Sequence, residues 1–274
     1  MSVQLTSPPV DELVGRLRAV LERRYHHLHP FNQRMHRGEL SREELQLWVA
    51  NRFYYQISIP IKDALILSSC PEREVRQQWI QRIIDHDGRP GEEGGIEAWL
   101  RLGEAMGVKR EDLVGQRFLL PGVRFAVDAY VNFCRFRPWL EAVAASLTEM
   151  FAPLIVKERL AAMLSHYKWV DPAGLQYFKN RLTQAPRDAE YALGLVTERF
   201  RTPEEQERAV AALEFKCDVL WCLLDAVERG PMPGTAPWPP PADRPCLAFT
   251  PRRASSTTTC VGGMCCSTPK GWWR

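Results

Sequence analysis

Apolar residues recur every three or four positions through most of residues 9–229, with polar residues between them. This spacing matches the turn of an α-helix, whereas strand-like alternation and paired hairpin turns are absent. The pattern predicts an all-α domain with helices near residues 9–28, 41–69 (interrupted around Pro60), 72–87, 93–106, 123–148, 149–166, 171–199 and 203–229.

Start signals accompany three of these helices. Ser41 and Glu44 have the spacing of a capping box ahead of LQLWVANRFYYQ. Asp171-Pro172 has the pattern of an N-cap followed by a first-turn proline, and residues 202–205, TPEE, combine both devices. The starts of these helices are thus predicted independently of the apolar pattern.

The segment WVANRFYYQISIPIKDA, residues 48–64, places Arg52, Tyr55 and Gln56 on or near one face of a mostly apolar helix. An unpaired buried polar group costs about 1–3 kcal/mol. Two interpretations remain open at this point. Either Arg52 extends to water along a helix edge, or the segment forms one wall of an interior polar cavity.

Polar residues interrupt apolar faces in nearly every predicted helix. Arg82 with His86, and Tyr177 with Arg181, are four residues apart and share a face. The other such positions are Tyr25, His26, Tyr130, Glu149, Arg159 and Lys216. Several cations with histidines and tyrosines around one core would suit a small, polyanionic, aromatic ligand.

Composition narrows the function classes. The chain has 274 residues, 45% hydrophobic and 25% charged, which is typical of one or two globular domains, and its net charge of +3 is too small to indicate nucleic-acid binding. It contains no apolar run of the ~18 residues that would predict a membrane span. The N-terminus, MSVQLTSPPVDELVGRL, lacks a secretory signal pattern. These features predict a cytoplasmic protein.

Motifs for metal or nucleophilic catalysis are missing. A P-loop and a G-x-S-x-G elbow do not occur. Asp85-His86-Asp87 is contiguous, so its side chains point around a helix, and no Glu-x-x-His occurs; we expect no metal site. Cys134 could act as a nucleophile, but we expect reduced core residues at Cys70, Cys134, Cys217 and Cys222.

The longest motifs resemble one known family. YHHLHP, WVANRFYYQ, DHDG, GGIEAWLRLGEA, LPGVRFAVDAY, LTEMFAP and FKCDVLW resemble the pyrroloquinoline-quinone synthases, in order and spacing, from about residue 10 to 230. The resemblance implies a compact, heme-oxygenase-like seven-helix bundle, without heme or metal, that forms a homodimer. It also implies an activity: closing the last ring of a bicyclic tricarboxylate quinone precursor and oxidising it to pyrroloquinoline quinone (PQQ) with dioxygen, releasing hydrogen peroxide.

The resemblance assigns roles to the polar residues. Those expected to bind substrate are Tyr25, Arg52, Gln56, Arg82, Tyr130, Glu149, Arg159 and Lys216, and those expected to be catalytic are His26, His86, Tyr177 and Arg181. Imidazoles and phenols can take up the protons released during ring closure and oxidation. Cationic donors can stabilise reduced oxygen species. No cofactor is expected, because dioxygen is the co-substrate and PQQ the bound product.

The chain departs from the family at Val156. In FAPLIVKERL the matching position of the family motif, FAP-x-I-H, is a histidine. Valine cannot transfer a proton. Either another group such as His26 takes over this role, or the enzyme is partly disabled and retains its affinity for the ligand.

Two other functions compete with this one. A thiaminase-like C–N hydrolase on the same fold would use Cys134 as nucleophile in a cavity poor in cations. A non-catalytic helical module would bind the quinone without consuming oxygen.

The chain changes character near residue 230. Residues 1–229 form the predicted synthase domain, 230–245 a proline-rich linker, and 246–274 a tail without periodicity. Codons for MCCSTPKGWW, shifted by one base, can encode YVLLNPEGVV, which resembles a PqqD-type peptide chaperone that some family members carry fused behind the synthase. We therefore expect a frameshift remnant of a fused PqqD domain, and a chaperone of this type as a partner.

Overall fold

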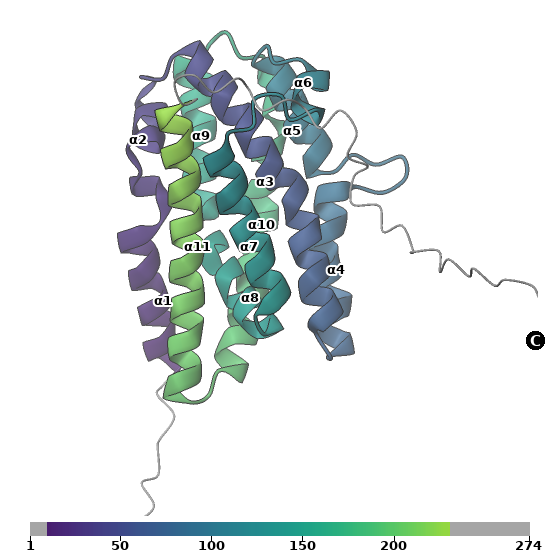
Figure 1. Ribbon diagram of the computed structural model, residues 1–274, viewed down its shortest axis with the longest axis vertical. Helices are drawn as coiled ribbons and strands as arrows, with labels where there is room; N and C mark the ends of the chain where they lie inside the picture. Colours follow the sequence, from purple (N-terminus) through teal and green to yellow (C-terminus); the bar gives the residue numbers. More distant parts are fainter. Residues whose placement is uncertain (1–9, 231–274) are drawn as a thin grey trace, which may run out of the picture. The chain divides into compact units, whose positions relative to one another are not determined.

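The structure is a computed structural model that describes residues 10–230 (Figure 1). Helices make up most of this range, and within it only an isolated bridge between Arg89 and Glu92 has β-geometry. The elements, with η for 3-10 helices, are α1 (Val10–Arg24), η1 (His26–Leu28), α2 (Pro30–Arg37), α3 (Arg42–Ser69), α4 (Arg73–Asp87), α5 (Gly95–Ala105), α6 (Arg110–Val114), α7 (Pro121–Phe136), α8 (Trp139–Ala145), η2 (Ser146–Met150), α9 (Ala152–His166), η3 (Pro172–Leu175), α10 (Gln176–Arg199) and α11 (Pro203–Arg229). The predicted all-α fold class is confirmed.

The long helices pack side by side as a bundle. Helix α11 packs between α1 and α7, and α3 packs against α4, α5 and α7 (Figure 1). Helices α9 and α10 pack against each other and against η2. Segments far apart in the sequence therefore meet around one interior.

Capping explains several of the boundaries. Ser41 Oγ accepts from Glu44 N at 3.1 Å while Glu44 Oε2 accepts from Ser41 N at 2.7 Å, so the predicted capping box is present. Thr202 and Glu205 form the same box at the start of α11. Asp171 also caps as predicted, but it starts the short η3 rather than α10.

The expected interruption at Pro60 is wrong. Helix α3 continues through Pro60 from Arg42 to Ser69. An interior proline costs about 3 kcal/mol in an isolated helix because it removes one hydrogen bond and crowds the preceding turn. Around Pro60, however, the side chains of Gln56, Ile59 and Asp63 are buried, and their packing holds the helix together.

Other predicted helices are divided. The first ends at Arg24, and α2 (Pro30–Arg37), which the apolar pattern missed, starts where His29 Nδ1 accepts from Phe31 N at 3.1 Å. The predicted helix 123–148 breaks before Pro138, since proline disfavours the α-conformation at the residue before it. Seven helices are expected for the bundle. Because of such breaks, the numbering of α-helices within residues 10–230 reaches α11.

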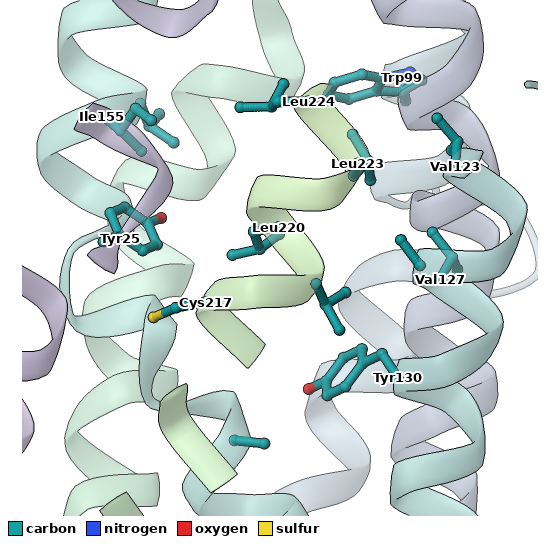
Figure 2. Packing of buried hydrophobic residues seen from close by; sticks show 14 of the residues in the cluster. Tyr25, Trp99, Val123, Val127, Tyr130, Ile155, Cys217, Leu220, Leu223 and Leu224 are labelled. Atoms are coloured by element: carbon teal, nitrogen blue, oxygen red, sulfur yellow. The ribbon is translucent and has the colours of Figure 1, made fainter. Parts of the chain in front are cut away.

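The core lies on both sides of α11 (Figure 2). Cys217, Leu220 and Leu224 project from α11, with Tyr25 and Ile155 toward one side and Val123, Val127 and Tyr130 of α7 toward the other. Cys70, Cys134 and Cys217 are buried free thiols, as predicted. Cys222 is exposed, contrary to prediction, because it shares a helix face with Asp218 and Asp225.

Within residues 10–230 no single helix has the length and apolarity needed to cross a membrane; Trp139–Met150 with Ala152–His166, bent by 41°, meet that test only as a pair. The predicted linker beyond Gly230 and the tail at 246–274 lie outside the described residues. The frameshift hypothesis therefore stays a prediction.

Candidate functional site

An interior cavity with about 70 Å³ of free volume lies where η1, α3, α9 and α10 meet. It is lined by Tyr25, His26, Arg52, Tyr55, Gln56, Ile59, His86, Trp99, Thr148, Glu149, Ala152, Ile155, Val156, Arg159, Tyr177, Arg181 and Leu220. Most of the predicted site residues are in this set. Arg82, Tyr130 and Lys216 are buried but do not line the cavity.

Helix α3 contributes one wall through residues spaced by three and four positions. The Arg52 guanidinium stacks 3.9 Å above the ring of Tyr55. Gln56 Oε1 accepts from the Tyr177 hydroxyl at 2.9 Å, while Gln56 Nε2 is buried without a partner in the described part of the chain. The cavity-wall interpretation of residues 48–64 is therefore correct, and Arg52 faces the interior.

Helix α9 contributes a second cation to the lining of the cavity. Arg159 is 6% exposed, and its guanidinium carbon lies 5.0 Å from the centroid of the Trp48 ring. Its Nη2 donates to Asn32 Oδ1 at 2.9 Å, but its Nε has no partner among residues 10–230. Burial and the neighbouring Arg52 lower the pKa of Arg159 to about 10, so it still carries its charge at neutral pH.

The two cavity histidines are neutral at pH 7. Burial, reinforced by Arg52 and Arg159, lowers the pKa of His26 well below its usual value. Burial and Arg181 lower the pKa of His86 to about 4. Nδ1 of His86 lies 2.9 Å from the Arg82 carbonyl oxygen, which can only accept, so this nitrogen carries the proton and Nε2 keeps its lone pair.

A second group of cations is paired with carboxylates. Glu149 accepts from Arg82 Nη2 at 2.6 Å and from Arg181 Nη2 at 3.3 Å. Asp63 accepts from Arg82 Nε at 3.3 Å, and Asp188 lies 3.5 Å from Arg181 Nη1. Burial alone would raise the pKa of Glu149, but Arg82 and Arg181 outweigh it and lower the pKa to about 2. Glu149 therefore orients these arginines as an anion.

Lys216 is placed behind Tyr55. Its Nζ donates to the Tyr55 hydroxyl at 2.7 Å and lies 3.6 Å from the centroid of the Tyr130 ring. Burial and the cations Arg52 and Lys62 lower the pKa of Lys216 well below its usual value. Lys216 is thus connected to the cavity by its hydrogen bond to Tyr55, which lines the wall.

Sequence reasoning did not assign roles to some of these residues. Tyr55 stands three positions after Arg52 in a family motif, so helical spacing could have identified it. Lys62 and Asp63 interrupt an apolar run, and they form a buried ion pair at 2.6 Å behind the cavity. Trp99 and Thr148 also line the cavity, but no spacing or interrupted apolar run in the sequence marks them as site residues.

Val156 lies on the cavity wall and is buried. It occupies α9 three residues before Arg159, so a side chain at this position faces the same cavity.

Across residues 10–230, no three His, Cys, Asp or Glu side chains gather as metal ligands would.

A family model describing the TENA/THI-4/PQQC family matches residues 16–226. The chain belongs to this family. Its match spans nearly all of the described helices, so the family assignment covers the cavity and every candidate residue around it.

Two relatives within the TENA/THI-4/PQQC family are close in sequence. Pyrroloquinoline-quinone synthase from Ectopseudomonas mendocina is 55% identical over 227 residues, which cover 83% of this chain and 90% of that protein. The protein of the same name from Pseudomonas aeruginosa is 58% identical over 205 residues, covering 74% and 82%.

Solved structures at low identity show the shared fold. A domain with a heme oxygenase-like fold from Shewanella denitrificans has a TM-score of 0.64 at 14% identity, covering 80% of this chain and 90% of that one. A TenA homologue from Pseudomonas syringae has a TM-score of 0.63 at 16% identity, covering 81% and 94%. The expected heme-oxygenase-like fold is confirmed.

Proposed function

We propose that this protein catalyses the last step of PQQ biosynthesis. Dioxygen would drive ring closure and multi-electron oxidation of the bicyclic tricarboxylate quinone precursor, with release of hydrogen peroxide and without a metal or redox cofactor. The relatives named pyrroloquinoline-quinone synthase, at 55% and 58% identity, support the place of this chain in PQQ biosynthesis. The cavity supports the chemistry.

The main support for this proposal is a set of hydrogen-bond donors that face the cavity and have no acceptor within residues 10–230. Gln56 Nε2 and Arg159 Nε are buried without acceptors, and no side chain of residues 10–230 forms an ion pair or hydrogen bond with Arg52. Each unsatisfied buried donor costs about 1–3 kcal/mol. Carboxylate oxygens of a polyanionic ligand would supply the missing acceptors and form charge-assisted hydrogen bonds.

The free volume also indicates how binding would proceed. Pockets for drug-sized ligands typically hold about 300–1,000 Å³, whereas this cavity has about 70 Å³. A tricyclic tricarboxylate therefore requires lining side chains, or the segments that carry them, to move outward. The donors would then close on the ligand.

Residues near His86 would handle protons and oxygen. Its unprotonated Nε2 can accept a proton from carbon or nitrogen of the substrate. Each dioxygen that becomes hydrogen peroxide takes two electrons from the quinol form of the substrate and two protons. Arg181, which lowers the pKa of His86, would stabilise the negative charge that dioxygen gains as it is reduced.

The hydrolase alternative fits the site less well. Cys134 does not line the cavity and is fully buried, and burial raises the pKa of its thiol to about 11. Thiolates, not thiols, are the reactive nucleophiles. The cavity is also rich in cations, which that activity does not call for.

One experiment separates a synthase from a carrier. The protein is mixed with the quinone precursor without oxygen, oxygen is admitted, and absorbance and peroxide are followed. A synthase consumes oxygen, forms PQQ and releases peroxide. Binding of the quinone without oxygen consumption would overturn the proposal. The homodimer, the PqqD-type partner and the cytoplasmic location remain predictions.

A further inference from the structure

A fully buried asparagine outside the cavity wall connects two residues on it. Asn32, in the first turn of α2, has 0% exposure. Its Nδ2 donates to the His26 carbonyl oxygen at 2.7 Å and lies 2.9 Å from His26 Nδ1. Its Oδ1 accepts from Arg159 Nη2 at 2.9 Å.

These contacts determine which way the amide points. An arginine guanidinium can only donate, so the atom facing Arg159 is the amide oxygen. A backbone carbonyl can only accept, so the atom facing His26 is the amide nitrogen. With an N–H group directed at it, His26 Nδ1 must carry a lone pair. The neutral ring therefore holds its proton on Nε2.

His86 has the opposite arrangement, because its Nδ1 donates to the Arg82 carbonyl at 2.9 Å. Neither ring has a partner for its Nε2 among residues 10–230, and both rings line the cavity. At Nε2, then, His26 offers a proton donor and His86 a proton acceptor.

We propose that Asn32 is a positioning residue that fixes His26 in the Nε2–H tautomer and holds Arg159 beside it, so that His26 donates a hydrogen bond to a ligand oxygen and His86 alone serves as the histidine base. The identity of that oxygen as a carboxylate or carbonyl of the quinone rests on the proposed function. The tautomer assignment does not. In this arrangement His26 cannot replace the histidine missing at Val156.

The ligand-free full-length protein provides the first test. Long-range proton–nitrogen correlation spectra of protein labelled with ¹⁵N-histidine distinguish the two tautomers, and His26→Gln and His86→Gln identify the signals. At pH 7 we expect His26 with its proton on Nε2 and His86 with its proton on Nδ1. A His26 proton on Nδ1 would overturn the proposal, whatever the activity.

The second test changes the positioning residue. Asn32→Asp replaces the amide donor with an acceptor, so we expect His26 to move its proton to Nδ1 and to lose the donor at Nε2. Affinity for PQQ, measured by titration, should fall roughly ten- to a hundredfold through the loss of this donor. An unchanged tautomer in this variant refutes the role of Asn32.

Asn51→Asp is a matched control. Asn51 is equally buried, but its amide bridges Leu47 O, Phe118 O and Leu120 N at 2.8–3.0 Å, away from the cavity. The His26 signal should not move in this variant.

The tests also distinguish failure of this inference from failure of the proposed function. Correct tautomers in a protein that fails to bind PQQ would reject the proposed function and leave the tautomer assignment standing.

Discussion

The cavity has two cationic regions that differ in how their charges are balanced. In the open region, Arg52 and Arg159 face the interior without carboxylate partners among residues 10–230. In the paired region, Arg82 and Arg181 share Glu149. Buried charges require compensation, so the open region is suited to an anionic ligand, whereas the paired region is already satisfied and is suited to holding groups in place. The comparison separates cations that are free to bind an anion from cations that carboxylates hold in place.

The largest expected effect comes from adding a proton-transfer group to the open region. We expect Val156→His to raise turnover by about 10²–10⁴-fold, the usual contribution of one general acid or base, with little change in affinity for PQQ. Oxygen consumption and PQQ titration measure the two quantities. If the protein with Val156 already turns over many times, and the variant is no faster, a histidine at this position is dispensable.

Breaking the paired region should reduce stability rather than binding. Glu149→Gln leaves Arg82 and Arg181 undercompensated, and removing one partner of a buried ion pair costs about 3–5 kcal/mol. Urea denaturation measures the loss in the free energy of unfolding. Glu93→Gln, whose partner Arg101 is 52% exposed, is the control and should cost less than ~1 kcal/mol. Equal losses in the two variants would contradict a stabilising role for Glu149 in the paired region.

The sequence predicts the helices well where periodicity and caps agree, as at Ser41 and Thr202. It wrongly predicts a break at Pro60, because local helix propensity does not include the packing of α3 against neighbouring helices. It also misses α2, whose start depends on a side-chain cap from His29. Both failures have the same physical cause: tertiary contacts and side-chain hydrogen bonds outweigh the local pattern.

The same division applies to the site. Arg52 and Gln56 are recognisable because polar side chains interrupt an apolar face. Asn32 is not, since its role depends on Arg159, 127 residues away in the sequence. Lys216 is predicted to bind substrate, yet its hydrogen bond goes to Tyr55, which sequence reasoning left without a role. Residue types are thus predictable, whereas hydrogen-bond partners and tautomers require the fold.

Removing one open cation tests the binding side of the comparison. Arg52→Ala should weaken PQQ affinity roughly ten- to a hundredfold, because charge-assisted hydrogen bonds are worth about 1.5–3 kcal/mol. Arg42→Ala is a control on the same helix, since Arg42 stacks on Trp169 at 4.7 Å rather than lining the cavity. Lys216→Ala should also weaken binding, through Tyr55. Unchanged affinity in Arg52→Ala would remove Arg52 from the binding set.

The smallest expected effect is a change in how stability depends on pH. The folded-state pKa of His86 is lowered to about 4 from an unfolded value of 6.5. Between these values the unfolded chain binds a proton that the folded protein does not, so the stability contributed by the neutral ring is full above pH 6.5 and falls as pH drops toward 4. One such histidine contributes at most about 1.4 kcal/mol per pH unit. We expect His86→Gln to lower the slope of unfolding free energy against pH in this window, relative to the unsubstituted protein. A slope identical to that of the unsubstituted protein would mean that burial and Arg181 do not hold His86 neutral, and the contribution of Arg181 to preparing a base would fail with it.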